Sequence, residues 1–343
     1  MAAYSTGSIG PQMMNSADSN PTEIFAGRFN HCASICKSYS GITMAWYSGS
    51  GECQDDQSVH TLFMVPTHNH GFEARMGRLD DKTGNPVLWV DDSGPLMLWS
   101  KFEPHPITKL TDRWKHCSIW VSRLDGYGKI RHKPVLLAKA DEHLLGRCAP
   151  ICVDDRPDAK DPEWIIPLYD EVNEECVLYK GTYPNYKPYA RFGQKQIQPT
   201  IWKTDGGYRA LSRNFNSPIK QAILNKSVDG ASWDAGIQTD IRNINSSLCI
   251  TTWRGHQFII WNDSNTAYRT NLTLGLVADN GITPIAKINR YYGSYPSACV
   301  IDDKLYYAYT NNNKRISYGY FDWSDIRRHH RNNESEGDAQ SIP

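Results

Sequence analysis

The sequence predicts an all-β protein that folds as a six-bladed β-propeller, with the ring closed by its N-terminal strand. The apolar residues occur in short alternating runs, and no helix-length stretch with a 3.6-residue period competes with them. Gly, Asp and Asn are frequent between the runs, as hairpin turns require. A unit of three runs recurs six times with a spacing near 50 residues, which is typical of propeller blades.

The first strand of each unit is predicted to begin at a residue with a polar group, often followed by Pro. The six runs are HCASIC from His31, NPVLWV from Asn85, KPVLLA from Lys133, QPTIWK from Gln198, NSSLCI from Asn245 and YPSACV from Tyr295. They begin 54, 48, 65, 47 and 50 residues apart. Pro is tolerated at the first position of a strand, because no hydrogen-bond donor is needed there.

Two further runs follow each first run and complete a three-stranded unit. The second runs are ITMAWYSG, LMLWSKF, HLLGRCAP, YRALSRN, QFIIWND and LYYAYTN. The third runs are SVHTLFMV, HCSIWVSR, CVLYKGTY, IKQAILNK, NLTLGLVA and RISYGYFD. The outer strands fall in the variable segments between units, and TEIFAGRF, before His31, is expected to complete the last blade. We therefore expect a flexible tail over residues 1–20, the propeller over 21–323 and a polar C-terminal tail over 324–343.

The six entrance residues are expected to surround one end of the central channel. The first strand of a propeller blade lines the axis, and the second strand returns to the same rim. That return adds Glu52, Lys101, Arg213 and Asn262. These groups could simply cap strand ends and hold channel water. Burying so many charges without a use would cost several kcal/mol each unless they were paired, so the pattern favours a binding site.

The composition gives no reason to expect a nucleic acid as the partner. Equal numbers of basic and acidic residues, 37 each, and a pI near 7.1 leave no basic block for a nucleic acid. No run approaches the ~18 apolar residues of a membrane span. The beginning, MAAYSTGSIG, has no basic region followed by an apolar stretch, so the chain is expected in the cytoplasm or a virus particle, or secreted if a leader has been removed.

No metal or cofactor is expected from the cysteines, and the sequence does not indicate an oligomeric state. The nine cysteines are an odd number, and none of their spacings has a second zinc-type pair nearby. The 11 Trp and 19 Tyr suit half-buried strands and also stack on sugar rings.

Three short motifs resemble the Asp-box turn of the sialidase superfamily. SVDGASW, residues 227–233, is similar to Ser-x-Asp-x-Gly-x-Thr-Trp shortened by one residue. SRLDGYG, residues 122–128, and ADNGITP, residues 278–284, resemble eroded copies at the same place in other blades. With the sixfold repeat, these motifs identify residues 25–322 as similar to the BNR-repeat, sialidase-like propellers.

The resemblance implies a site at the propeller mouth. In sialidases three arginines bind the substrate carboxylate, an Asp is the acid/base, and a Tyr assisted by a Glu is the nucleophile. Arg213 and Arg269 stand where the second and third arginines fall, and Tyr295 stands near the nucleophile. The acid/base position corresponds to Asp56 or its neighbour Asp55.

Two positions depart from the sialidase pattern. His31 replaces the first arginine, and Gln198 stands where the assisting Glu is expected. Gln198 cannot accept the proton of a tyrosine, whereas His31 is a good base near neutral pH. Sialidase-like propellers include lyases and hydrolases of uronic-acid-containing glycans that transfer protons with a histidine, so the resemblance implies that chemistry rather than a true sialidase.

The sequence therefore predicts an exo-acting glycosidase or uronate lyase that cleaves an acidic oligo- or polysaccharide. The catalytic candidates are His31, Tyr295, Asp56 and Glu52. The substrate-binding candidates are Lys133, Arg213, Arg269, Gln198, Asn85, Asn245 and Lys101. Hydrolysis needs two carboxyl groups about 5–9 Å apart, supplied by Glu52 with Asp56 or Glu171. The alternative is a non-catalytic glycan-binding or structural propeller, such as a virion or adhesion component.

Overall fold

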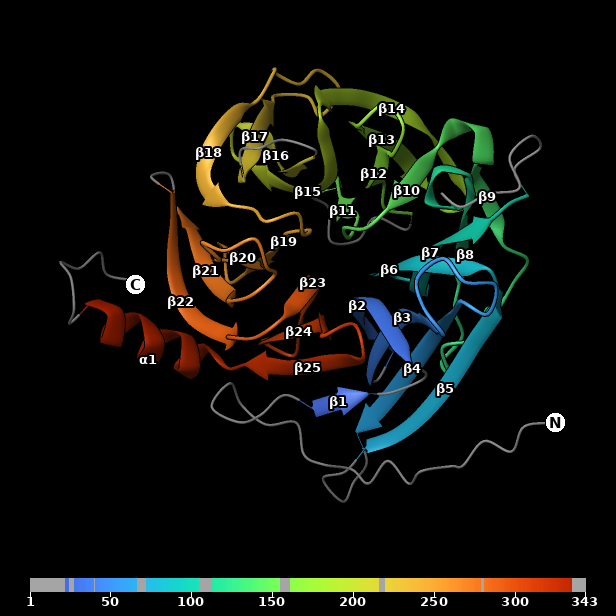
Figure 1. Cartoon of the computed structure of the whole chain (residues 1–343), viewed down its shortest axis with the longest axis horizontal. Helices are drawn as coiled ribbons and strands as arrows, with labels where there is room; N and C mark the ends of the chain where they lie inside the picture. Colours follow the sequence, from blue (N-terminus) through green and yellow to red (C-terminus); the bar gives the residue numbers. More distant parts are fainter. Residues whose placement is uncertain are drawn as a thin grey trace.

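Six antiparallel sheets surround a central axis in the computed structural model (Figure 1). The structure describes residues 22–24, 28–39, 41–66, 72–104, 113–154, 161–215, 220–278 and 281–334. The first strand of each sheet lies nearest the axis and the last lies at the rim. The predicted six-bladed β-propeller is confirmed.

Blades 1 to 3 use the N-terminal half of the chain. Blade 1 contains β2 (Phe29–Ser38), β3 (Gly41–Gly49), β4 (Ser58–Pro66) and β5 (Phe72–Asp81). Blade 2 contains β6 (Thr83–Asp91), β7 (Gly94–Phe102), β8 (Cys117–Arg123) and β9 (Val135–Ala138). Blade 3 contains a split inner strand, β10 (Leu144–Gly146) and β11 (Ile151–Cys152), followed by β12 (Trp164–Asp170), β13 (Glu175–Thr182) and β14 (Asn185–Gln194). Short 3-10 helices occupy Arg113–Lys115 and Ala140–Glu142.

Blades 4 to 6 complete the ring. Blade 4 contains β15 (Gln196–Thr204), β16 (Gly207–Asn214), β17 (Gln221–Ser227) and β18 (Ile237–Arg242). Blade 5 contains β19 (Cys249–Trp253), β20 (His256–Asn262), β21 (Leu272–Ala278) and β22 (Gly281–Asn289). Blade 6 contains β23 (Gly293–Ile301), β24 (Lys304–Asn311) and β25 (Arg315–Phe321), with β1 (Thr22–Ile24) as its outer strand. The N-terminal strand thus closes the ring, as predicted.

The third unit was assigned wrongly from the sequence. The run after Lys133 is β9, the outer strand of blade 2, and not an inner strand. The run HLLGRCAP, expected as a second strand, instead supplies the inner strand of blade 3. Because β10 and β11 have only three and two residues, their alternation is too short to stand out from the stronger pattern of β9.

A β-bulge interrupts the inner strand of four blades near its start. The pairing register shifts there, and one residue has left-handed backbone geometry: Cys32, Asn85, Gln198 or Tyr295, with φ between 44° and 55°. Pro follows this residue in three of the four bulges. Because the bulge leaves a position outside the ladder, Pro loses no hydrogen bond there. The polar–Pro signature therefore marks a bulge inside each strand rather than the strand's first residue.

A hydroxyl group two residues beyond the bulge links neighbouring blades. Ser34 Oγ accepts a hydrogen bond from Leu88 N at 2.8 Å, and Ser297 Oγ accepts one from Ile35 N at 3.2 Å. Thr200 Oγ1 accepts one from Ile250 N at 3.1 Å. Since the ladders run within blades, these bonds connect inner strands that no described ladder joins. We call Ser34, Thr200 and Ser297 the linking hydroxyls.

The apolar core consists of layers between successive blades. Trp46 is fully buried among residues of blades 1 and 6, and its indole N–H donates to Asn30 Oδ1 at 3.0 Å. Similar clusters of buried side chains fill the other junctions. The core thus holds the blades face to face and leaves their inner edges to line the axis.

The segment after β25 is ordered, contrary to prediction. Trp323–Glu334 forms helix α1 beside β22, outside the ring (Figure 1). Its first residue, Trp323, lies against Trp253 with ring centroids 5.0 Å apart. The expectation of a loose tail from residue 324 is wrong for this helix. Residues 1–20 lie outside the described residues. None of the described helices has the length and apolar character that crossing a bilayer requires.

Candidate functional site at the propeller mouth

Five of the six expected entrance residues lie where inner strands begin. His31 is on β2, Asn85 on β6, Gln198 on β15 and Tyr295 on β23, and Asn245 precedes β19. We call this end of the channel the mouth. Lys133, by contrast, is exposed on the outer edge of blade 2, so its predicted place at the channel is wrong.

A histidine–tyrosine pair forms the centre of the mouth. The rings of His31 and Tyr295 lie edge to face, with centroids 4.5 Å apart. The Arg269 guanidinium, from the segment between β20 and β21, lies 4.8 Å from the Tyr295 ring centroid. Three blades therefore contribute to this group. Its two most distant members in sequence, His31 and Tyr295, are 264 positions apart (295 − 31).

The surroundings of His31 keep its imidazole neutral. Only 3% of the residue is exposed, and its Nδ1 has no hydrogen-bond partner among the described residues. Burial lowers the pKa of His31 well below its usual value, and the positive charges of Arg269 and Arg147 lower it further. The Asn313 side chain opposes this shift. A neutral imidazole can accept a proton from a bound molecule.

Arg213 anchors the opposite part of the mouth. It comes from the end of β16, and its Nε donates to Asn245 Oδ1 at 2.8 Å. A second nitrogen lies 3.4 Å from Gln198 Oε1, and Gln198 in turn donates to the Tyr169 hydroxyl at 3.4 Å. The partners of Arg213 within the described part of the chain are thus amides, which leave its charge uncompensated.

The two carboxylates in the loop after β3 are held in different ways. Glu52 accepts hydrogen bonds from the Tyr47 hydroxyl at 3.1 Å and from Trp114 Nε1 at 3.2 Å. Asp56 accepts bonds from the backbone and hydroxyl of Ser50, and the Ser50 N–H lowers the pKa of that carboxyl. Tyr47 connects Glu52 to the centre, because its ring lies 5.5 Å from that of His31.

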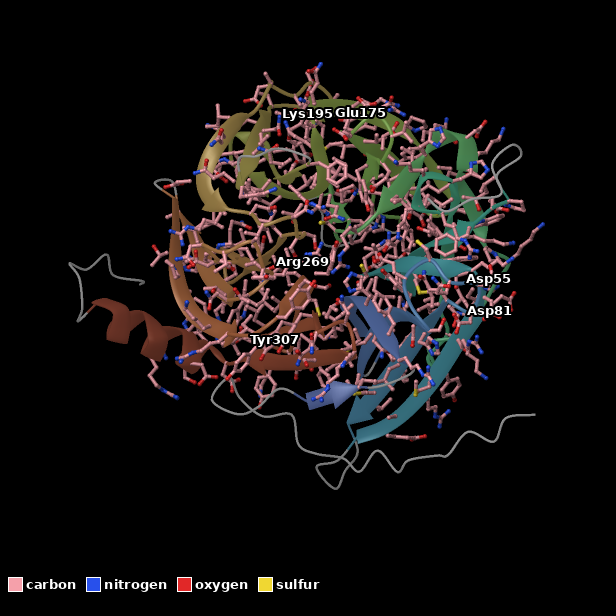
Figure 2. The ribbon with its side chains drawn as sticks, viewed as in Figure 1. Asp55, Asp81, Glu175, Lys195, Arg269 and Tyr307 are labelled. Carbon is pink, nitrogen blue, oxygen red and sulfur yellow. The ribbon has the colours of Figure 1, made fainter. Side chains whose placement is uncertain are left out.

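Other predicted residues lie away from the centre of the mouth. Asp55 forms an ion pair with Arg113 at 2.8 Å, and Figure 2 labels it toward the outer edge while Arg269 lies nearer the axis. Lys101 is exposed one strand out from the axis, in register with Thr83. Asn262 donates to the carbonyls of Thr270 and Gly293 and thereby holds the segment that carries Arg269.

Sequence reasoning missed two residues of the mouth. Tyr169, on β12, is buried and contacts Gln198, and burial raises the pKa of its hydroxyl well above the usual value. Arg147, between β10 and β11, is buried and reaches Tyr295 from blade 3. A charged residue inside the apolar run HLLGRCAP was the available signal, but the wrong assignment of that run concealed it.

The turn with the clearest Asp-box resemblance lies between β17 and β18. Asp229 accepts hydrogen bonds from the backbone of Ala231 and Ser232, and Trp233 Nε1 donates to the Gly230 carbonyl. Trp233 also stacks on Phe192 of blade 3, with centroids 4.5 Å apart. The turn therefore ties neighbouring blades together at the periphery, away from the inner strands.

The profile of one protein family, described as a BNR repeat-like domain, matches residues 41–306. Comparison with curated protein sequences finds no significant match.

Solved sialidase structures share the fold at low sequence identity. A mutant of Trypanosoma rangeli sialidase displaying trans-sialidase activity superposes with a TM-score of 0.64 at 13% identity, covering 95% of this chain and 60% of that one. The same sialidase in complex with the inhibitor DANA gives 0.65 at 12% identity, covering 97% and 63%. The parainfluenza virus 5 hemagglutinin-neuraminidase ectodomain gives 0.53 at 9%, covering 91% and 87%.

The chain corresponds to less than two thirds of the length of the Trypanosoma proteins. The shared part is the propeller, whose six blades and inner-strand mouth are described above. The chain therefore belongs to the BNR repeat-like domain family, and its six-bladed fold is similar to that of the solved sialidases.

Proposed function

We propose that this protein is a carbohydrate-active enzyme that cleaves an acidic glycan at the mouth. The observation that carries the proposal is a mouth with two arginines that have neutral partners among the described residues. Arg269 lies against the Tyr295 ring of the His31–Tyr295 pair, and Arg213 lies beside the amides of Asn245 and Gln198. Uncompensated guanidinium groups beside a neutral base suit a substrate that brings its own negative charge. The related solved structures include a sialidase in complex with sialic acid, which is an acidic sugar.

Arg213 and Arg269 would bind the sugar carboxylate. Asn245 Oδ1 accepts hydrogen bonds from Nε and Nη2 of Arg213, and Gln198 Oε1 accepts one from Nη1, so two of the five N–H groups remain for a ligand. Gln198, Asn85 and Asn245 would provide neutral hydrogen bonds to sugar hydroxyls. Lys133 has no part in this proposal because it lies on the outer edge, and Lys101 would act only on a ligand that extends past the rim.

His31 would transfer the proton, with Tyr295 as its partner. In an elimination, the arginines neutralise the carboxylate and so acidify the α-proton. His31 removes that proton, a double bond forms as the glycosidic C–O bond breaks, and the Tyr295 hydroxyl protonates the departing oxygen. The ring contact of 4.5 Å makes these two groups adjacent enough to act on one sugar.

Hydrolysis places different demands on the same mouth. It would need Glu52 with Asp56 or Glu171 as the carboxyl pair. Glu52 is engaged by Tyr47 and Trp114, and the lowered pKa of Asp56 leaves it ionised and unsuited to act as an acid. These contacts favour elimination, while the fold shared with sialidases supports hydrolysis.

A panel of uronic-acid polysaccharides and sialylated oligosaccharides tests the proposal. Lyase activity would produce an unsaturated uronate detected by its ultraviolet absorbance, and hydrolase activity would produce reducing ends without that signal. His31→Ala and Arg213→Ala should each reduce turnover at least about a hundredfold, as expected for loss of an acid/base group or a carboxylate ligand. Lys133→Ala is the matched control and should retain full activity.

The non-catalytic alternative predicts a different result. Gln198 provides an amide where the sialidase pattern has a carboxylate, which favours binding without turnover. Saturable binding of an acidic oligosaccharide, abolished by Arg213→Ala but with no product over long incubation, would replace the enzyme proposal with a glycan-binding one.

A further inference from the structure

The buried Arg147 reaches across the central channel at the mouth. Arg147 belongs to blade 3, is 4% exposed, and makes its described hydrogen bonds to three other blades. Its Nη1 donates to the Ala33 carbonyl of blade 1 at 3.0 Å. Its Nη2 donates to the carbonyls of Tyr295 and Pro296 in blade 6, the latter at 3.2 Å, and its Nε donates to Ser247 Oγ at 3.3 Å.

Three of these four acceptors are backbone carbonyls of two bulges. Ala33 follows the left-handed Cys32, and Tyr295 is itself left-handed with φ 54°. A bulge interrupts the ladder and leaves carbonyls without strand partners, and left-handed geometry is unfavourable for residues other than glycine. The planar guanidinium has five N–H donors in a fixed fork, so it can satisfy several carbonyls from different strands at once.

The two clamped bulges carry the His31–Tyr295 pair. His31 precedes Cys32 directly, and Tyr295 is the bulge residue of β23. The Arg147 guanidinium also lies 5.4 Å from the Tyr295 ring centroid. We infer that Arg147 is a positioning residue, which clamps the bulges of β2 and β23 across the channel and thereby holds His31 and Tyr295 in place.

The clamp also leaves a fixed positive charge near His31. All the described hydrogen-bond acceptors of Arg147 are neutral oxygens. His31 faces charged, aromatic and amide groups from several blades. They are Arg147 and Arg269, the rings of Tyr295, Tyr47 and Phe29, and the Asn313 side chain, with Glu52 behind Tyr47. Two cations therefore oppose protonation of His31, and the Asn313 side chain favours it.

Two variants, Arg147→Lys and Arg147→Met, distinguish the effect of the Arg147 hydrogen bonds from the effect of its positive charge. The primary readout is the NMR signal of the His31 imidazole and its titration in histidine-labelled protein, identified among the 11 histidines with His31→Gln. Both variants should shift the His31 signal, because neither keeps the fork. Only Arg147→Met should raise the titration midpoint, because Lys retains the charge. If Arg147→Met does not fold, the shifted signal in Arg147→Lys still tests the clamp.

Arg123→Met is the control for the Arg147 variants, because it removes another buried arginine. Arg123 is paired with Asp91 at 2.7 Å in blade 2, with no described contact to the mouth, so its loss should destabilise the protein without moving the His31 signal. An unchanged His31 signal and midpoint in both Arg147 variants would overturn the inference.

The inference depends on the proposed function only for its effect on turnover. There, Arg147→Lys should lower kcat by about a hundredfold with a smaller change in KM, since misplaced catalytic groups affect the chemical step. A wild-type protein without turnover, but with shifted His31 signals in the variants, would refute the proposed function and leave the clamp supported. Full kcat in Arg147→Lys with an unmoved His31 signal would refute the clamp alone.

Discussion

At Tyr295, side chains from four blades meet. His31, Arg147 and Arg269 come from blades 1, 3 and 5, and each contacts the Tyr295 ring or its backbone. Such a meeting depends on closure of the whole ring, because no two of these residues are neighbours in sequence. The chemical role of Tyr295 therefore depends on the side chains that the fold places next to it.

Gln198 shows how one neutral side chain preserves the charge of the mouth. Its Oε1 lies 3.4 Å from an Arg213 nitrogen. Gln198→Glu would create a buried ion pair and neutralise Arg213, so the affinity for an acidic oligosaccharide should fall by about tenfold, equivalent to about 1.4 kcal/mol. Isothermal titration calorimetry measures this change.

Gln238→Glu adds the same charge on the exposed outer strand β18 and is the control for Gln198→Glu. It should bind the oligosaccharide as the wild type does. Equal or tighter binding by Gln198→Glu would show that Arg213 does not contact the acidic group of the ligand.

The inner strands combine a bulge and a linking hydroxyl within a few residues. Thr200 is 4% exposed and accepts its hydrogen bond from Ile250 N in the next blade. Thr200→Val retains the shape but leaves that N–H without its partner, so the free energy of unfolding should fall by about 1–2 kcal/mol. Urea unfolding followed by tryptophan fluorescence gives the value.

Thr252→Val on the exposed end of β19 is the comparison for Thr200→Val. Its hydroxyl bonds only to the Gln257 side chain, so the change should stay within about 0.5 kcal/mol. If the two variants lost the same stability, the linking hydroxyls would have no special role between blades.

The repeat spacing in the sequence predicted most of the inner strands, but it failed for the inner strand of blade 3 for a physical reason. The runs from His31, Asn85, Gln198 and Tyr295 each lie within an inner strand of 9 or 10 residues, so their alternation is long enough to detect. In blade 3 the inner strand is split, and the outer strand after Lys133 has the stronger pattern. Arg147 could not be assigned to the mouth because its contacts depend on three blades that lie far away in sequence.

Across the whole molecule, buried histidines couple stability to pH. Burial lowers the pKa of His31 well below its usual value and that of His60 to about 4. The unfolded chain, with histidine pKa values near 6.5, binds more protons than the folded chain between these limits. The free energy of unfolding should therefore be highest above about pH 6.5 and fall toward pH 4, by about 3 kcal/mol from His60 alone, with a further loss from His31.

Urea unfolding at a series of pH values measures this dependence. His60→Gln should flatten the curve between about pH 6.5 and pH 4, while His132→Gln at an exposed position should leave it unchanged. Asp229 and Asp303, whose pKa values hydrogen bonds lower to about 2, act in the same direction only at lower pH. A curve that is flat down to pH 4 in the wild type would contradict the role of the two histidines.

Within one inner strand, the bulge residue contacts the mouth and the linking hydroxyl binds the neighbouring blade. Ligand binding and blade packing therefore depend on different positions. Gln198 contacts the groups of the mouth, whereas Thr200, two residues later, bonds to the adjoining blade. Tyr295 and Ser297 divide the tasks in the same way. A descendant of this protein could exchange one set for a new ligand and leave the other untouched, so altered specificity need not erode the scaffold.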